Sequence, residues 1–147
     1  MNTAARQAVV AEALSWLGTP YAHRQRLKGV GVDCAQLPLA VYAAAGVIGA
    51  AEVGAYASQW HLHRSEELYL RHLQALGGRE IARTEAQSGD FVLWRYGRTF
   101  SHGAILTGRG GQVVHAVRGL GVVLGHFDAD EDLRSRQMKL FTLSPPP

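Results

Sequence analysis

Cys34, the only cysteine of the chain, lies where a thiol can become reactive. It is part of the stretch GVGVDCAQLPLAVY, residues 29–42, and directly follows Asp33. Aspartate is a favoured N-cap residue, so the apolar run after it predicts a helix that begins beside the thiol. The N-terminus of a helix lowers a thiol pKa and favours the nucleophilic thiolate. The alternative is a small buried hydrophobic residue, and the stretch by itself favours this second interpretation.

Two histidines could supply the partners that a thiol nucleophile needs. A Cys–His mechanism requires one imidazole as the base and a further polar group that orients its ring. His102 opens the run SHGAILTG, and His115 interrupts the apolar run QVVHAV. Hairpin strands joined at GRGG could place the two rings side by side on one face. Each histidine alone is better explained as a polar residue at a strand end or a hydrogen-bonded core histidine, but the ordered set of one cysteine and two histidines is much more specific.

Helical signals fill the first part of the chain and surround the cysteine. Apolar spacing predicts a first helix over residues 3–17, and a mostly apolar run predicts a second over residues 34–45. The polar, glycine-bearing segment 21–32 between them predicts a loop. A third helix is predicted from Ser65 to Leu76, with an alternative start near Ser58.

Strand signals fill the part of the chain after residue 88. Helices followed by hairpin-linked strands predict an α+β fold with a mainly antiparallel sheet of about five strands. The predicted strands are DFVLWRY (90–96), HGAILTG (102–108), QVVHAV (112–117), GVVLGHF (121–127) and QMKLFTL (137–143).

Length and composition indicate one globular unit. The chain has 147 residues, of which 47% are hydrophobic and 18% charged, enough to bury a single core. We therefore expect one domain over residues 1–143 and a proline-rich tail over residues 144–147. A single cysteine excludes an internal disulfide, so packing alone must hold the fold.

Several classes of partner are disfavoured by the distribution of charge. The net charge is +3, and the basic residues are scattered without interleaved aromatics, so no nucleic-acid partner is expected. The uncharged run 34–51 contains glutamine, proline, glycine and many alanines, which favours a buried helix and a loop over a membrane span. Residues 1–18 carry Glu12 in their apolar stripe, so they do not resemble a secretory signal.

The remaining histidines do not predict a metal site or a cofactor. His61 and His63 are two positions apart and do not share a helix face, and no cysteine pair accompanies them. We expect His23 and His72, like this pair, to be ordinary surface or cleft side chains.

Five segments spread over nearly the whole chain resemble the NlpC-type family of bacterial and phage cell-wall cysteine peptidases, a circularly rearranged relative of the papain fold. The resemblance implies a papain-like NlpC-type fold in which N-terminal helices pack on a C-terminal sheet. The matching segments, in the order of the family, are LGTPY (17–21), DCAQL (33–37), SGDFVLW (88–94), SHGAILTG (101–108) and VVHAV (113–117).

The resemblance also implies a role for each site residue. Cys34 corresponds to the nucleophile, His102 to the general base and acid, and His115 to the group that orients His102. Tyr21 matches a tyrosine whose hydroxyl lies beside the nucleophile and assists the oxyanion or the substrate. Asp33 could bind a substrate amine or could cap the helix, and both readings stay open.

The chain departs from the family pattern next to the nucleophile. Ala35 and Gln36 stand where the family usually has Ser-Gly, a serine that helps to hold the free amino-terminal alanine of the stem peptide in some members. Pro38 replaces an apolar helix former, and its ring and missing N–H predict a distorted first turn. Substrate choice is therefore expected to differ more than the chemistry.

The function implied is that of a cysteine endopeptidase of peptidoglycan stem peptides, acting at the γ-D-glutamyl–diaminopimelate bond through a thioester. The stretch YAHRQRLKGVGVDC, residues 21–34, resembles the branch found in phage tails and phage-like gene transfer particles. We accordingly expect synthesis in the cytoplasm without a signal peptide, incorporation into a tail with other tail proteins, and action in the cell envelope. The alternatives are amide hydrolysis or acyl transfer on another substrate, and a structural tail-assembly protein with little activity.

Overall fold

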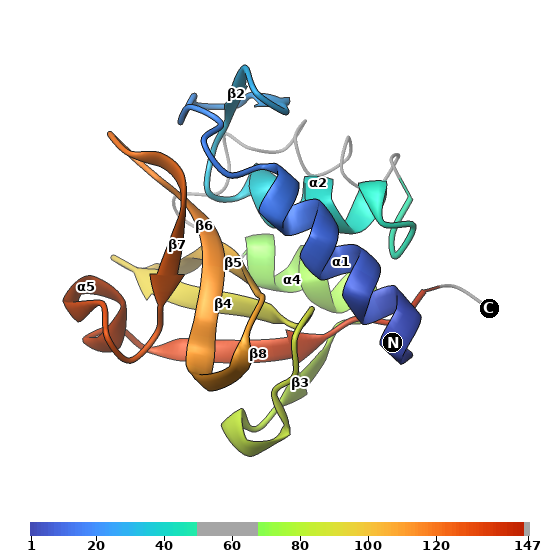
Figure 1. Cartoon of the computed structure of the whole chain (residues 1–147). Coiled ribbons are helices and arrows are strands. Elements are labelled where there is room, and N and C mark those ends of the chain that lie inside the picture. Colours follow the sequence, from blue (N-terminus) through green and yellow to red (C-terminus); the bar gives the residue numbers. More distant parts are fainter. Residues whose placement is uncertain (50–67, 146–147) are drawn as a thin grey trace.

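The computed structural model describes residues 1–49 and 68–145, shown as a cartoon in Figure 1. In these ranges no helix has the length and apolar character needed to cross a bilayer. The helices are α1 (Thr3–Ser15), α2 (Gln36–Ala44), α4 (Leu68–Ala75) and α5 (Glu131–Arg134), with 3-10 turns at Arg83–Glu85 and Arg109–Gly111.

Six strands form one sheet in the order β3-β8-β4-β5-β6-β7, and every neighbouring pair is antiparallel. A separate two-stranded hairpin pairs β1 with β2. The strands are β1 (Arg26–Leu27), β2 (Gly31–Val32), β3 (Arg79–Ile81), β4 (Phe91–Tyr96), β5 (Thr99–Leu106), β6 (Gln112–Val117), β7 (Gly121–His126) and β8 (Met138–Thr142).

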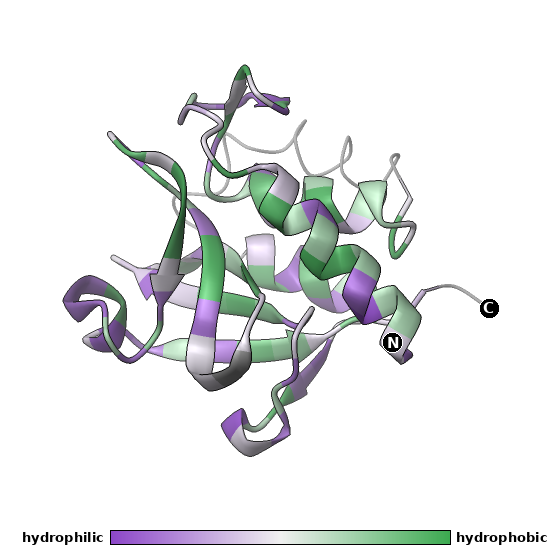
Figure 2. Cartoon of the chain, viewed as in Figure 1, coloured by the Kyte–Doolittle hydropathy of each residue, from purple (hydrophilic) through white to green (hydrophobic). Residues whose placement is uncertain are grey.

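Alternating residues along the strands fill two apolar clusters, one on each face of the sheet. The larger cluster lies under α1, α2 and α4, where Leu37, Tyr42 and Phe91 are fully buried. The smaller cluster lies on the other face and includes Trp94 and, from α5, Leu133. Figure 2 shows apolar colour along α2 and polar colour over α5. The period-2 alternation of the strands thus decides which side chains meet the helices.

The α+β fold class with a mostly antiparallel sheet is confirmed, and the five predicted strands are all present. The sixth, β3, was not predicted because its three residues are mainly polar and exposed. The prediction of a loop over residues 21–32 was wrong in part, since this segment contains the β1–β2 hairpin. Strands of two or three residues are too short to show an alternation that can be recognised from sequence.

The second helix begins later than predicted. Residues 34–35 form a turn, and α2 starts at Gln36. Pro38 is then the third residue of the helix, within the first turn, where a backbone N–H has no intrahelical acceptor. The predicted start of the third helix, Ser65 or Ser58, lies outside the described residues.

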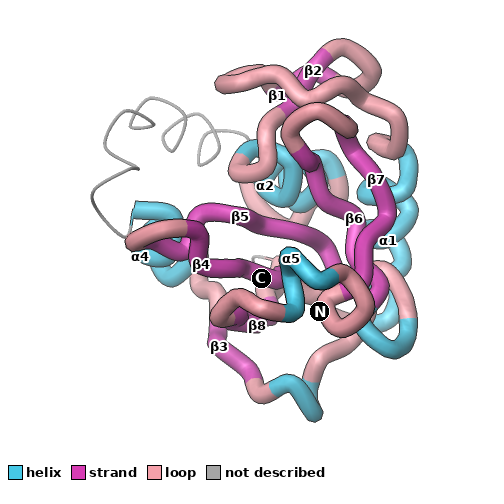
Figure 3. Tube along the Cα trace, turned by 90° about the vertical axis from the view of Figure 1, so that its left-hand side faces the viewer, coloured by secondary structure: helices cyan, strands magenta, loops and turns pink. Residues whose placement is uncertain are grey.

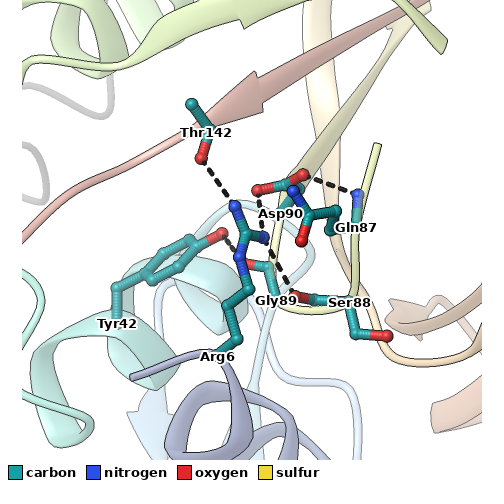
Figure 4. A network of polar contacts seen from close by, with 7 residues as sticks. All are labelled: Arg6, Tyr42, Gln87, Ser88, Gly89, Asp90 and Thr142. Carbon is teal, nitrogen blue, oxygen red and sulfur yellow. Dashed lines mark hydrogen bonds and ion pairs between the residues drawn. The ribbon is translucent and has the colours of Figure 1, made fainter. Parts of the chain in front are cut away.

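A buried polar joint connects the helices to the sheet (Figure 4). Arg6 of α1 donates to Asp90 Oδ1 at 2.8 Å, to the Ser88 carbonyl at 3.1 Å and to Thr142 at 3.4 Å. Tyr42 of α2 donates to the Gly89 carbonyl at 2.7 Å. Gly89 has a φ of +93°, and a Cβ there would lie 3.3 Å from Arg6 Cα, so a glycine allows α1 to approach this turn.

We predict that Arg6→Met lowers the free energy of unfolding by about 3–5 kcal/mol, because it leaves a buried carboxylate without its counter-charge. Asp90 is only 1% exposed at its side chain, and Arg6 15%. Chemical denaturation measures the change. Glu80→Gln, which removes the more exposed pair with Lys139, is the control and should cost less than about 1 kcal/mol. Equal losses for the two variants would contradict a special role for the joint.

Candidate active site

Asp33 stabilises the turn that contains Cys34. Its side chain is fully buried, and Oδ1 accepts hydrogen bonds from the backbone N–H groups of Ala35 at 3.1 Å and Gln36 at 2.8 Å. Oδ2 accepts from the N–H of Arg24 at 2.8 Å. The carboxylate therefore satisfies donors at the start of α2 and ties the hairpin segment to the same point.

The thiol of Cys34 lies between two oxygen atoms from different parts of the chain. The Tyr21 hydroxyl lies 3.8 Å from Sγ, and the Ser101 carbonyl lies 3.9 Å from it on β5. Tyr21 reaches this position because its backbone bridges to Val32 at the end of β2. The hairpin and the sheet thus meet at the sulfur.

Burial and, to a smaller extent, the neighbouring Asp33 carboxylate raise the pKa of the Cys34 thiol to about 11, although the Tyr21 hydroxyl opposes both. The sequence argument expected the helix N-terminus to lower this pKa. The helix begins at Gln36, two residues after Cys34, and the negative Asp33 carboxylate accepts the N–H groups at its start. The resting side chain is therefore a neutral thiol at pH 7.

His102 and His115 are hydrogen bonded to each other, with 2.9 Å between His102 Nε2 and His115 Nδ1. Strand pairing explains the contact, since Ile105 of β5 pairs with Val114 of β6. Continuing this register puts the two histidines at diagonal positions on one face of the sheet, which is within reach of two rings. The structure therefore brings together the two imidazoles that the strand pattern predicted could meet.

Both rings are buried and uncharged. His102 is 8% exposed and His115 6% exposed. Burial and, to a smaller extent, the adjacent His115 lower the pKa of His102 to about 3. Burial also lowers the pKa of His115. A neutral imidazole has one bare ring nitrogen, so each ring can act as a proton acceptor at neutral pH.

Aromatic rings fix the position of His102. Trp94, its partner on β4, has its ring centroid 5.6 Å from the imidazole, and the Tyr96 ring lies at 5.1 Å. The Tyr96 hydroxyl donates to Asp132 at 2.6 Å, and the Arg136 guanidinium lies 3.5 Å over the Tyr96 ring. Tyr96 and its partners were not predicted from the sequence. The available signal was that Tyr96 follows Trp94 by two positions on β4, which places both rings on the same face of the sheet.

A cleft of about 610 Å³ joins these groups. Its walls include Cys34, His102, His115 and Tyr21, together with Arg118 and residues of α5. In Figure 3, α5 lies at the front of the molecule and α1 at its right-hand edge. Residues of α5 line one wall of the cleft. Arg118, whose guanidinium lies 5.8 Å from the Tyr21 ring, was missed because a single arginine after a strand is unremarkable in sequence.

Within residues 1–49 and 68–145, no group of three or more His, Cys, Asp or Glu side chains is arranged to hold a metal ion. His61 and His63 lie outside these residues. The reactive groups that line the cleft are the thiol of Cys34 and the imidazoles of His102 and His115.

Comparison with protein families gives a match to the model of the NlpC/P60 family over residues 18–137. The chain belongs to the NlpC/P60 family. Apart from Leu17, the match includes all the segments from LGTPY to VVHAV, so the family resemblance is confirmed; it carries no information on a phage-tail type. Comparison with proteins of curated function finds no significant match.

Solved structures of NlpC/P60 domains share this fold at low sequence identity. The NlpC/p60 domain of the peptidoglycan hydrolase SagA has a TM-score of 0.61 and 24% identity, over 92% of this chain and 97% of that one. RipD of Mycobacterium tuberculosis, described as a non-catalytic NlpC/p60 protein adapted to peptidoglycan binding, has a TM-score of 0.60 and 19% identity, over 94% and 96%. The P60 domain of the Mycobacterium avium paratuberculosis antigen MAP1272c has a TM-score of 0.56 and 18% identity, over 93% of this chain and 91% of that one.

We predict that alkylation of Cys34 in the folded protein continues to accelerate between pH 8 and 10, by about tenfold per pH unit, because the thiolate is the reactive form and its pKa is raised to about 11. Asp33→Asn removes a charge that disfavours the thiolate and should shift this curve to lower pH. The rate is measured with iodoacetamide, and the single cysteine makes the label specific.

The unfolded protein is the control for this measurement, since its thiol has an ordinary pKa and its rate should level off above about pH 9. A folded-state rate that is already constant at pH 7 would show a preformed thiolate and contradict the prediction.

Proposed function

We propose that this NlpC/P60 domain is a cysteine endopeptidase that hydrolyses peptidoglycan stem peptides, at the γ-D-glutamyl–diaminopimelate bond. The observation that carries the proposal is the 2.9 Å bond between His102 and His115 in the same cleft as the Cys34 thiol. These three groups are the nucleophile, the base and the orienting group that acyl transfer through a thioester requires.

The resting charges favour a mechanism in which the proton moves as the substrate reacts. His102 uses Nε2 to contact His115, which leaves Nδ1 to accept the thiol proton. The sulfur attacks the carbonyl carbon, and the backbone N–H of Cys34 with the Tyr21 hydroxyl stabilise the oxyanion. The intermediate collapses to a thioester when the amine leaves with the proton from His102. Water, deprotonated by the same ring, then releases the acid and restores the thiol.

The charges of the cleft suit a stem peptide, which carries both carboxylates and amines. Arg118 lies on the wall beside Tyr21, and Glu131 lies on the wall formed by α5. A cleft lined by charges of both signs favours a substrate that itself carries both.

A non-catalytic binding or structural role is the rival function. The raised thiol pKa supports it, as does the similarity to RipD, an NlpC/p60 domain protein described as non-catalytic. Against it, burying two neutral histidines has a cost in stability that a binding surface does not require. Hydrolysis of a defined peptide decides between the two.

We predict that Cys34→Ala abolishes release of soluble peptides from purified peptidoglycan, and that His102→Asn lowers it by at least about a thousandfold, because each removes a group on which the covalent step depends. Products are identified by mass spectrometry, which also names the bond cut and separates peptide hydrolysis from amide hydrolysis or acyl transfer elsewhere. Undiminished release by Cys34→Ala would overturn the proposed role of Cys34, whereas no release by the wild type would leave the binding role.

We also propose that a free amino-terminal alanine is not required. Both oxygens of the Asp33 carboxylate already accept backbone N–H groups, and Ala35 has no hydroxyl to hold an amine. A synthetic L-Ala-γ-D-Glu-diaminopimelate peptide and its N-acetyl form are therefore expected to have kcat/KM values within about threefold of each other, since acetylation changes no occupied contact. A loss of a hundredfold or more on acetylation would contradict this.

For the biological setting, we propose a tail component of a phage or phage-like particle that opens the cell wall during DNA entry. The support is the resemblance of residues 21–34, which form the hairpin before the nucleophile. Mass spectrometry of purified particles from the producing strain tests it. Absence of the chain from the particles would reject this setting while leaving the peptidase proposal unaffected.

A further inference from the structure

The second ring nitrogen of His115 needs a partner if the pair is to work as proposed. When His102 Nε2 donates its proton to His115 Nδ1, His115 must carry its own proton on Nε2. In the opposite arrangement His115 donates, and His102 then carries its proton on Nδ1, where it could not accept one from Cys34. The acceptor near His115 Nε2 therefore decides which arrangement exists.

Gly125 of β7 marks where that nitrogen lies. A Cβ built on Gly125 would be 2.6 Å from His115 Nε2 and 2.9 Å from Asp130 Oδ2. The two atoms thus converge on the same small space and are separated by no more than the sum of these distances. Both contacts are closer than real Cβ atoms approach, so the absence of a side chain at Gly125 leaves room for the imidazole and the carboxylate to face each other.

The loop between β7 and α5 holds the Asp130 carboxylate in this place. Asp130 Oδ2 accepts from the N–H of His126 at 2.9 Å, and the N–H of Asp130 donates to the carbonyl of His126 at 3.0 Å. The His126 ring stabilises this loop, because its Nδ1 accepts hydrogen bonds from the N–H groups of Asp128 at 3.1 Å and Ala129 at 3.2 Å. Backbone donors therefore fix the carboxylate without neutralising it.

Asp130 occupies the N-cap position of α5, yet its side chain makes no cap hydrogen bond to that helix in the described structure. An aspartate at this position ordinarily accepts from the first turn. Here it turns back toward β6 and β7, which requires another explanation than helix capping.

The other charged groups near His115 are already paired. Asp132 accepts from the Tyr96 hydroxyl at 2.6 Å and from Arg136 at 3.0 Å. Burial lowers the pKa of His115, and the Asp130 carboxylate is the foremost opposing influence, followed by Asp132. Asp130 is exposed at the rim of the cleft, so its effect is smaller than that of a buried carboxylate.

His115 Nε2 and Asp130 Oδ2 are too far apart for a direct hydrogen bond, at a separation that one water molecule can bridge. We infer that Asp130 is a positioning residue that accepts the Nε2 proton of His115 through a bridging water and so fixes the tautomers of the His115–His102 pair. The inference rests on the proposed function for its catalytic meaning, but the tautomers exist in the free protein. The chain of proton donors then runs from Cys34 through His102 and His115 to a carboxylate on the loop before α5. The carboxylate also stabilises the positive charge that spreads over the pair when His102 takes the thiol proton.

Nitrogen NMR of the histidine-labelled free protein tests this inference, because the protonated and bare nitrogens of a neutral imidazole have separate shifts. Wild type is expected to carry the His115 proton on Nε2. Asp130→Ala should populate both tautomers, whereas Asp130→Asn should keep the wild-type tautomer, since the amide oxygen can accept a hydrogen bond from the same water. Asp128→Ala is the matched control, because Asp128 lies on the same loop but pairs with Arg83 and should leave the tautomer unchanged.

Kinetics on the synthetic stem peptide form the second measurement. Asp130→Ala should lower kcat by about tenfold with little change in KM, because it removes one charge-assisted hydrogen bond. Asp130→Asn should lower kcat by less. A wild-type His115 tautomer in Asp130→Ala would overturn the inference, even if the variant melts at a lower temperature. If wild type does not cleave the peptide, the proposed function fails, and the NMR result alone decides the role of Asp130.

Discussion

The active-site geometry depends on the buried joint between Arg6 and Asp90. Cys34 comes from the helical part of the chain and the two histidines from the sheet, so nothing local fixes the distance between them. The joint ties α1 to the turn before β4, and the bond from Tyr42 to the Gly89 carbonyl ties the nucleophile helix to the same turn. Because α2 is nine residues long and β4 pairs directly with β5, this anchoring is transmitted to the thiol and to His102 over short, stiff elements.

The electrostatics of the site follow from the same burial. Enclosing a thiol and two imidazoles disfavours the charged form of each, which raises the pKa of Cys34 and lowers that of His102. An ion pair of thiolate and imidazolium is therefore not stored in the resting protein. In the proposed reaction this ion pair forms only with the substrate, whose carbonyl oxygen takes up the charge as the proton moves to His102. The arrangement limits the reaction of an exposed thiolate with other electrophiles.

Much of this could be predicted from the sequence, for reasons specific to each element. The runs that became β4 to β8 alternate strongly enough to be recognised, and the turn glycines between them set which strands pair. The proximity of His102 and His115 followed from that pairing. The exact start of α2 could not be predicted, because Asp33 caps a turn before the helix and Pro38 fits its first turn. The partners of His102 also escaped prediction, since Tyr96, Asp132 and Arg136 meet only through tertiary packing.

The short α5 region shows why such partners escape sequence analysis. Its four helical residues are too few to show helical periodicity, and their acidic composition is that of an ordinary solvated surface. Leu133 nevertheless anchors the segment in the smaller apolar cluster, which brings its neighbours to the rim of the cleft. The burial of Leu133 thus positions the polar residues around it as one wall of the candidate active site. Since the NlpC/P60 fold also includes a domain described as non-catalytic, these walls, together with the nucleophile and histidines, are where members of one fold can differ in chemistry.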